Sequence, residues 1–241
     1  MLGARPISTF SVEETIREIA QTGICAIIVT HNMEQATRVS DRTAFFYVGD
    51  MVETGPTKQI FSAPKTSVCR TISPEGWLMD MVERQNIEKS RSLSDSQAGI
   101  LSVAEGESVI SIRNFNLWYG DFQALRNISL EISKNKATAF IGPSGCGKST
   151  LLRAFNRMCD FVPTVRTEGT IEIAGRDIFA TEPNELRVMV GMVFQHPNPF
   201  PMSIRDNILY GPRRMRKISK AEGDEIAERC LRDAGLWDEA K

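Results

Sequence analysis

The residues with the clearest chemical potential form one continuous run in the second half of the chain: Gly142, Pro143, Ser144, Gly145, Cys146, Gly147, Lys148, Ser149 and Thr150. The run matches G-x-x-x-x-G-K-S in full, a pattern typical of a loop that wraps around nucleotide phosphates. Glycines let the backbone approach phosphate without Cβ clashes, so that successive N–H groups face the anion. Lys148 would place its ammonium on the β- and γ-phosphates, and Ser149 would ligate Mg²⁺. The run therefore predicts a site for a nucleoside triphosphate and Mg²⁺.

The elements that flank the run support this prediction. Residues 137–141 are an apolar run of strand length, and Leu151, Phe155 and Met158 recur at helical spacing. A helix that begins at the loop turns its positive N-terminus towards the anion. The alternative is a glycine-rich turn that merely begins a helix. It has little weight, because the Lys-Ser pair, the strand and the helix coincide.

The N-terminal part of the chain predicts a helix, a strand, a second helix and a hairpin. Ser11 and Glu14 fit a capping box at the start of the first helix, and Gly23 ends it. Residues 24–29 are a continuous apolar run, as expected of a strand buried on both faces of a parallel sheet. Residues 33–40 follow as a helix. The last element predicted in this part of the chain is a hairpin, with strands at 43–48 and 51–54 joined at Gly49-Asp50.

Residues 64–107 have the composition of a linker, with a short helix expected around residues 75–89. The following segment begins near Val109 and alternates apolar and polar residues, which predicts an antiparallel sheet with one buried face. Further strands are expected at 171–173 and 188–194. An amphipathic helix is expected over residues 219–235, with Ser219 and Glu222 as its capping box.

Composition and charge restrict the class of protein. Hydrophobic residues make up 41% of the 241 residues, enough for a packed core, and the formal charge of -1 gives no support to nucleic acid as a partner. No apolar run reaches the ~18 residues that span a bilayer, and the first residues lack the apolar region of a secretion signal. The five cysteines contain no Cys-x-x-Cys pair, which favours reduced thiols in a cytosol over a disulfide framework or a zinc site.

Two further strings resemble a known family. Residues 193–204 read Val-Phe-Gln-His-Pro-Asn-Pro-Phe-Pro-Met-Ser-Ile, and residues 29–33 read Val-Thr-His-Asn-Met. With the phosphate loop, they resemble the ATPase subunit of ATP-binding cassette (ABC) transporters, and the proline string is similar to that of phosphate importers. The resemblance covers nearly all of residues 6–63 and 109–241. It implies an α/β P-loop NTPase of ABC type, with a mixed sheet, an antiparallel β subdomain, and ATP and Mg²⁺ as ligands.

The resemblance also assigns roles outside the phosphate loop. Tyr119 resembles the aromatic residue that stacks on adenine, although a strand aromatic that covers the core is a serious alternative. Gln195 resembles the glutamine that senses Mg²⁺ and the attacking water, so it joins Ser149 as a metal-site residue. A lone Gln after a strand is otherwise a solvated loop residue. His31 resembles the switch histidine that contacts the γ-phosphate, where a histidine at a strand end is otherwise more often structural.

The order of these parts is reversed relative to the family. Residues 1–63 resemble the end of an ABC ATPase domain, residues 64–107 are the linker, and residues 108–241 resemble the beginning of such a domain. The Leu-Ser-Gly-Gly-Gln signature and an apolar strand ending in Asp-Glu are missing from the 241 residues. Two accounts stay open: a piece of two tandem cassettes, and a permuted domain without its middle. In the family the histidine strand lies beside the phosphate-loop strand, so strand 24–29 is free to pair with strand 137–141.

The resemblance implies an ATP-hydrolysing subunit of an importer that takes up inorganic phosphate. Its partners would be membrane-spanning permease subunits, a second ATPase domain and, indirectly, a phosphate-binding protein, at the cytoplasmic face of the cell membrane. The alternatives are a nucleotide-binding module that does not hydrolyse ATP and an incomplete gene product without an independent role. A small-molecule kinase is a weak further alternative, because Gln195 and its proline string have no place there.

Overall fold

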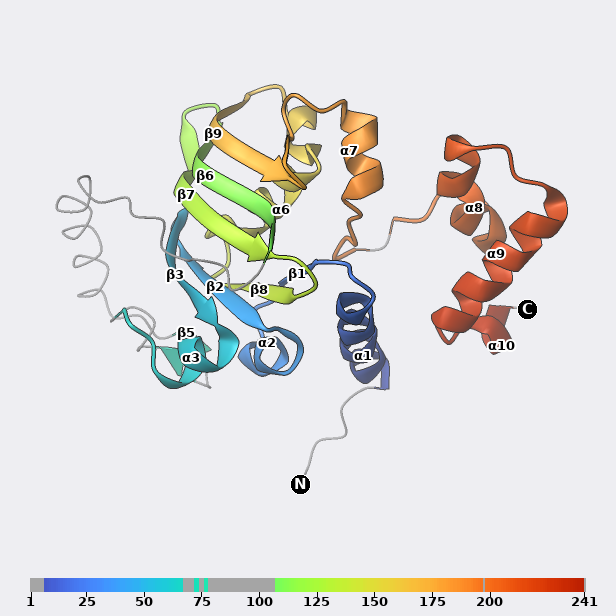
Figure 1. Ribbon diagram of the computed structural model, residues 1–241, viewed down its shortest axis with the longest axis horizontal. Helices are drawn as coiled ribbons and strands as arrows, with labels where there is room; N and C mark the ends of the chain where they lie inside the picture. Colours follow the sequence, from blue (N-terminus) through green and yellow to red (C-terminus); the bar gives the residue numbers. More distant parts are fainter. Residues whose placement is uncertain (1–6, 67–71, 74–75, 78–106, 197, 241) are drawn as a thin grey trace. The chain divides into compact units, whose positions relative to one another are not determined.

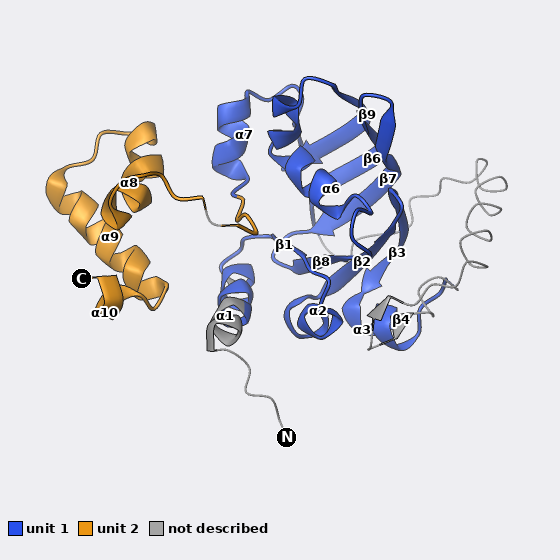
Figure 2. Ribbon diagram, turned by 180° about the vertical axis from the view of Figure 1, so that it is seen from behind, with its two compact units in different colours: residues 1–191 blue, residues 192–241 orange. Residues whose placement is uncertain are grey.

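The computed structural model describes residues 7–66, 72–73, 76–77, 107–196 and 198–240, and all structural statements below refer to these. The chain divides into two units, Met1–Gly191 and Met192–Lys241, each of which is described by itself (Figure 2). Most of the linker expected at 64–107 lies outside the described residues, so the expected domain boundaries stay a prediction.

The elements of the first unit that precede the linker run in this order: α1 (Ile7–Gln21), β1 (Ala26–Val29), α2 (Met33–Val39), β2 (Arg42–Tyr47), β3 (Asp50–Pro56) and α3 (Thr57–Ser62). Two short strands follow, β4 (Ile72–Ser73) and β5 (Gly76–Trp77), which pair with each other. The strand, the second helix and the hairpin confirm the expected sequence of elements. The first helix begins at Ile7, so the capping box expected at Ser11 is wrong because Ser11 lies inside the helix.

The remaining elements of the first unit are β6 (Ser108–Tyr119), β7 (Phe122–Ser133), β8 (Ala137–Ile141), α6 (Lys148–Phe155), the 3-10 helix η1 (Met158–Phe161), β9 (Val165–Ile173), β10 (Arg176–Asp177) and α7 (Pro183–Met189). The second unit contains α8 (Ile204–Met215), α9 (Lys220–Asp233) and α10 (Trp237–Ala240). Ser219 caps α9 by accepting a hydrogen bond from the Glu222 amide, as its capping-box pattern predicts.

One four-stranded sheet joins the two parts of the chain that resemble opposite ends of a domain. Its strand order is β1-β8-β2-β3 (Figure 1). β8 pairs in parallel with β1, with Val29 opposite Phe140, and in parallel with β2, with Ala44 opposite Phe140. The strand that precedes the phosphate loop therefore lies between two strands from the N-terminal part. The pairing of the histidine strand with the phosphate-loop strand is a finding of the structure.

Both faces of this sheet are covered, which explains why β8 is apolar at nearly every position. Alternate residues point to opposite faces of a strand. Ala44, Phe46 and Phe140 belong to the main core, together with residues of α6. On the other face lies a smaller cluster, Ala36, Phe45, Tyr47, Ala139 and Ile141, to which α2 contributes Ala36. The aromatic rings of Phe46 and Phe140 lie 5.1 Å apart, centroid to centroid.

A second sheet, with strand order β10-β9-β6-β7, is antiparallel throughout and packs into the same main core. Its inward positions alternate along the strands, as in Ile110 opposite Ile132 and Ile112 opposite Leu130. This confirms the antiparallel sheet expected from the alternation that begins near Val109. The mixed sheet and the antiparallel β subdomain are thus both present.

Two other sequence expectations do not match the structure. Residues 188–194 were expected to form a strand, but α7 extends to Met189 and residues 190–194 are not paired in any described sheet. Val193 is 96% exposed and Phe194 is 51% exposed, so this apolar run has no neighbouring strand to complete a ladder. A helix was expected around residues 75–89, but Gly76–Trp77 is a strand and the other residues lie outside the described ones.

Among the described residues, no helix combines the length and the apolar character needed to cross a bilayer.

The shared core predicts that the N-terminal part stabilises the phosphate-loop strand. Replacing Phe46 by Ala removes a fully buried ring packed on Phe140. We expect the free energy of unfolding to fall by about 3–5 kcal/mol, as for other buried Phe-to-Ala changes. Denaturant titration followed by far-UV circular dichroism measures this. The control is Phe122→Ala, because Phe122 is 66% exposed and its loss should change the stability by no more than about 0.5 kcal/mol. Equal midpoints for the two variants would contradict a shared core.

Candidate functional site

The phosphate loop connects the carboxyl end of β8 to the start of α6 and crosses the edge of the sheet. Gly142 follows β8 directly and has a φ of 147°. A Cβ atom at this position would collide with the Phe46 carbonyl oxygen and with Cys146 Sγ. Only glycine therefore allows the loop to leave the sheet at this point.

The loop reaches α6 through Gly147, which has a φ of 99° and is the N-cap of the helix. A Cβ atom on Gly147 would lie 2.7 Å from Leu125 Cδ2 and 2.9 Å from the Ala124 carbonyl oxygen. No side chain caps the helix, so the first amides of α6 are left to other acceptors. A small pocket of about 110 Å³ lies over this end of the helix and is lined by residues 145–150. Uncapped amides at a helix N-terminus are well suited to bind an anion.

Lys148 is buried, with 8% of its surface exposed, and its ammonium group is held inside the loop. Nζ donates hydrogen bonds to the carbonyl oxygens of Gly142 (2.7 Å) and Pro143 (2.8 Å), and to Cys146 Sγ (3.3 Å). All three ammonium hydrogens are therefore used within the loop. A phosphate that binds Lys148 has to compete with these acceptors.

These residues fit the phosphates of a nucleotide and a magnesium ion. The loop offers a buried cation, uncapped amides and a cradle in which side chains at Gly142 and Gly147 would clash. Ser149 lies in the first turn of α6 and is exposed, so its hydroxyl group is accessible. Among the described residues there is no cluster of three or more His, Cys, Asp or Glu side chains that could hold a metal.

The turn of the β2–β3 hairpin supports the loop from behind. The Gly49 amide donates to the Cys146 carbonyl oxygen at 3.2 Å, and the Gly49 carbonyl accepts from the Arg126 amide at 2.8 Å. Gly49 has a φ of 87°, and a Cβ atom there would lie 3.0 Å from the Ala124 carbonyl oxygen. The hairpin from the N-terminal part and strand β7 from the later part thus both contact the phosphate loop.

His31 lies next to the phosphate loop at the same edge of the sheet. β1 and β8 are parallel, and the Thr30 amide donates to the Phe140 carbonyl oxygen at 3.3 Å. His31 and Gly142 therefore leave adjacent strands at their carboxyl ends, where open α/β sheets bind ligands. The His31 side chain is exposed.

Tyr119 ends strand β6, opposite Phe122 on β7 and Val165 on β9. Its side chain is half-buried and packs against the main core. This packing favours the alternative weighed from the sequence, an aromatic residue that covers the core. The role of Tyr119 in stacking on adenine stays a prediction.

Gln195 belongs to the second unit, in a bend that follows the unpaired run 190–194. Its side chain is exposed. The structure thus brings the phosphate loop and His31 together within the first unit, and the contribution of Gln195 to the same site stays a prediction.

The hydrogen bonds that Thr30, Asn32 and Gln35 form around His31 were not predicted from the sequence. Asn32 caps α2 by accepting a hydrogen bond from the Gln35 amide at 3.0 Å, and the Gln35 side chain accepts one from Thr30 Oγ1 at 2.8 Å. The signal was present, because Asn followed three residues later by Gln is a pattern typical of helix starts.

Comparison with known proteins adds three findings. Residues 125–241 match the family described as ABC transporter. The chain is 52% identical over 140 residues to the "Phosphate import ATP-binding protein PstB" of Rubrobacter xylanophilus, and the match covers 57% of this chain and 49% of that protein. A solved bacterial Atm1-family ABC exporter with ATP bound has 28% identity and a TM-score of 0.43, with coverage of 65% of this chain and 27% of that one.

The chain thus spans about half the length of the curated relative that it matches. The family match includes the phosphate loop, α6, β9 and the helices of the second unit. Together with the mixed sheet and the antiparallel subdomain, it gives the fold class, an α/β P-loop NTPase of ABC type. Residues 125–241 of this chain are accordingly similar to the family described as ABC transporter.

Proposed function

We propose that the chain binds Mg-ATP at the phosphate loop as part of the ATPase of an ABC importer, and that the importer takes up inorganic phosphate. The observation that carries the proposal is the loop with buried Lys148 at the carboxyl edge of a parallel sheet, beside His31 on the neighbouring strand. Phosphate as the solute is supported by the proline string after Gln195 and by the name of the Rubrobacter relative, a phosphate import ATP-binding protein.

Each residue of the proposed site would contact a different part of Mg-ATP. Lys148 would exchange its bonds to the loop carbonyls for the β- and γ-phosphates, and the amides of α6 would hold phosphate oxygens. The Ser149 hydroxyl would ligate Mg²⁺, which neutralises phosphate charge when bound. His31 would donate to the γ-phosphate, Gln195 would sense Mg²⁺ and the attacking water, and Tyr119 would stack on adenine.

The second candidate is a module that binds nucleotide without hydrolysing it. Hydrolysis needs a carboxylate that holds the metal and a group that orients the attacking water. The 241 residues contain neither an apolar strand ending in Asp-Glu nor the signature motif. This observation favours binding without turnover by the chain alone. The proposed partners of the chain in an importer are permease subunits, a second ATPase domain and, indirectly, a phosphate-binding protein. We place this assembly at the cytoplasmic face of the membrane.

Replacing Lys148 by Ala should weaken the binding of Mg-ATP by about 10- to 100-fold, because a hydrogen bond to a charged group contributes ~1.5–3 kcal/mol. Isothermal titration calorimetry or a fluorescent ATP analogue measures the affinity. Lys134→Ala is the matched control, since it removes the same charge from an exposed lysine paired with Glu107. An unchanged affinity in the Lys148 variant would show that the phosphate loop is not the site.

The purified chain should bind ATP but release phosphate no faster than its Lys148→Ala variant. Loss of one aligned catalytic group typically lowers a rate by orders of magnitude, and the carboxylates of the family are missing here. Steady-state phosphate release, measured at saturating Mg-ATP, tests this. A rate clearly above that of the variant would favour the first candidate for the chain alone, and Asp50 and Glu53 would be the first carboxylates to replace.

Cys146 should report on occupancy of the loop. Its thiol is buried, and this desolvation raises its pKa, which outweighs the opposite effect of Lys148. Because the thiolate is the reactive form, alkylation of Cys146 should be slower than that of the exposed Cys230 and should still accelerate as the pH rises above 9. Mg-ATP should slow it further. Mass-spectrometric rates for the two peptides of one sample provide the comparison, and equal rates with and without nucleotide would argue against phosphates in this loop.

A further inference from the structure

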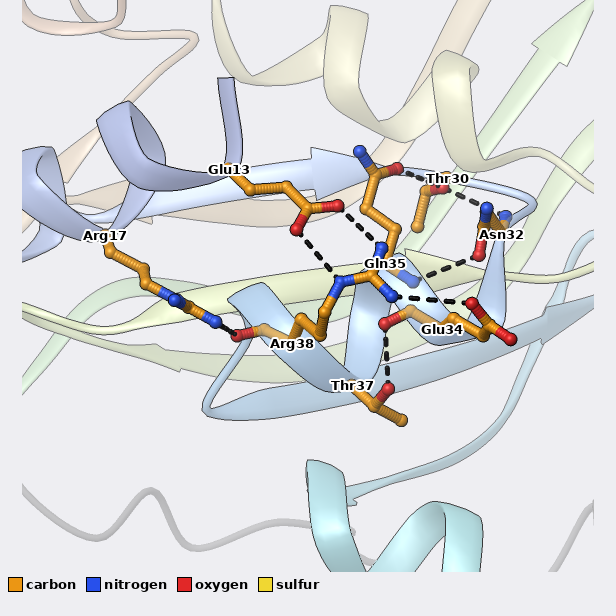
Figure 3. A network of polar contacts seen from close by, with 8 residues as sticks. All are labelled: Glu13, Arg17, Thr30, Asn32, Glu34, Gln35, Thr37 and Arg38. Carbon is orange, nitrogen blue, oxygen red and sulfur yellow. Dashed lines mark hydrogen bonds and ion pairs between the residues drawn. The ribbon is translucent and has the colours of Figure 1, made fainter. Parts of the chain in front are cut away.

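The residues on either side of His31 form a closed ring of hydrogen bonds that spans the end of β1 and the start of α2 (Figure 3). Thr30 Oγ1 donates to Gln35 Oε1 at 2.8 Å and accepts from the Asn32 amide at 3.0 Å. Asn32 Oδ1 in turn accepts from the Gln35 amide at 3.0 Å. The ring therefore runs from Thr30 to Asn32, on to Gln35 and back to Thr30, with His31 between its first two members.

The ring fixes the backbone of His31 from both sides. The amide of Thr30 is bound to Phe140 of β8, and the amide of Asn32 is bound to the hydroxyl of Thr30. The Thr30 side chain is buried, so leaving its hydroxyl without Gln35 and the Asn32 amide as hydrogen-bond partners would destabilise the folded chain. The His31 imidazole takes no part in the ring and is exposed. These hydrogen bonds thus fix the backbone from which the exposed side chain of His31 projects.

A second set of contacts holds α2 itself. The Arg38 guanidinium forms two hydrogen bonds with the Glu13 carboxylate of α1, from Nε at 2.9 Å and from the Nη2 nitrogen at 2.7 Å. Glu13 is buried and Arg38 is largely covered. Arg17 of α1 also donates, from Nε, to the Arg38 carbonyl oxygen at 3.1 Å. Arg38 lies in the last turn of α2, whereas Asn32 is the N-cap of the helix, so both ends of this short helix are anchored (Figure 3).

We propose that Thr30 and Gln35 are positioning residues that direct His31 towards the γ-phosphate of a nucleotide in the phosphate loop. The inference rests on the proposed function, because it assumes that His31 meets that phosphate. The amide oxygen of Gln35 can only accept a hydrogen bond, so the Thr30 hydroxyl must be the donor. The lone pairs of that hydroxyl are then available to accept the hydrogen bond from the Asn32 amide. Fixing a group in the direction of its ligand avoids the entropy loss of ordering it on binding.

The experiment compares the affinities of the full chain for Mg-ATP and Mg-ADP, because the ratio of the two dissociation constants isolates the contribution of the γ-phosphate. Thr30→Val keeps the side-chain shape and removes both hydrogen bonds of the hydroxyl. We expect it to reduce the preference for ATP by about tenfold, as His31→Ala should, which is the effect of losing one hydrogen bond to a charged group. Thr30→Ser keeps the hydroxyl and should retain the preference of the wild type.

Two further variants sharpen the comparison. Gln35→Leu removes the acceptor and should act as Thr30→Val does, while Gln35→Glu keeps an acceptor and should retain the preference. Thr37→Val is the matched control, because Thr37 lies on the same helix, is exposed and bonds only to the Glu34 carbonyl oxygen within the helix. Thermal unfolding of each variant confirms that the chain is folded at the temperature of the titrations.

The outcomes separate the inference from the proposed function. If His31→Ala reduces the preference for ATP but Thr30→Val does not, the positioning role is wrong and the role of His31 stands. If Thr30→Val weakens ATP and ADP equally, the ring supports the fold alone, and the inference is again overturned. If His31→Ala leaves the preference unchanged, His31 does not meet the γ-phosphate, and both the proposed role and the inference fail.

Discussion

The burial of strand β8 between β1 and β2 is the constraint on which the rest of the structure depends. A parallel strand with apolar residues on both faces is stable only when neighbours and helices cover it. Here both neighbours come from the N-terminal part of the chain, and the covering residues come from α6 on one face and α2 on the other. The phosphate loop leaves this strand at its carboxyl end, so its position is fixed by a sheet that neither part of the chain could complete alone.

The same sheet explains why the reversed order of the two parts does not prevent a site from forming. A strand pairs through its backbone and packs through its side chains, and neither interaction depends on which segment was first in the chain. The entropic cost of closing the connection between β3 and β6 grows only slowly with its length. His31 and Gly142 are thus neighbours across the sheet although more than 100 residues separate them in sequence.

Those parts of the fold could be predicted whose sequence pattern is compatible with only one type of secondary structure. The apolar run of β8, the glycine-containing turn of the hairpin and the alternation of β6 and β7 each determine a strand. The phosphate loop could also be predicted, since its glycines and Lys148 have fixed spacing. Residues 190–194 show the limit of this reasoning: their apolar pattern is typical of a strand, but a strand also needs a partner, and the described sheets offer none. The ring around His31 was missed because Thr30 and Gln35 act through a contact that the folded turn creates.

The contacts of Lys148 connect the stability of the loop to its affinity for a ligand. A buried ammonium without partners would be costly, and the carbonyls of Gly142 and Pro143 remove that cost. Phosphate gains a strong charged interaction only by displacing these acceptors, so its affinity reflects the difference between the two sets of bonds. The carbonyls belong to the residues just after β8, which the sheet and the Gly49 turn hold in place. The strands that bury β8 therefore also set how much of the lysine's charge is available to a nucleotide.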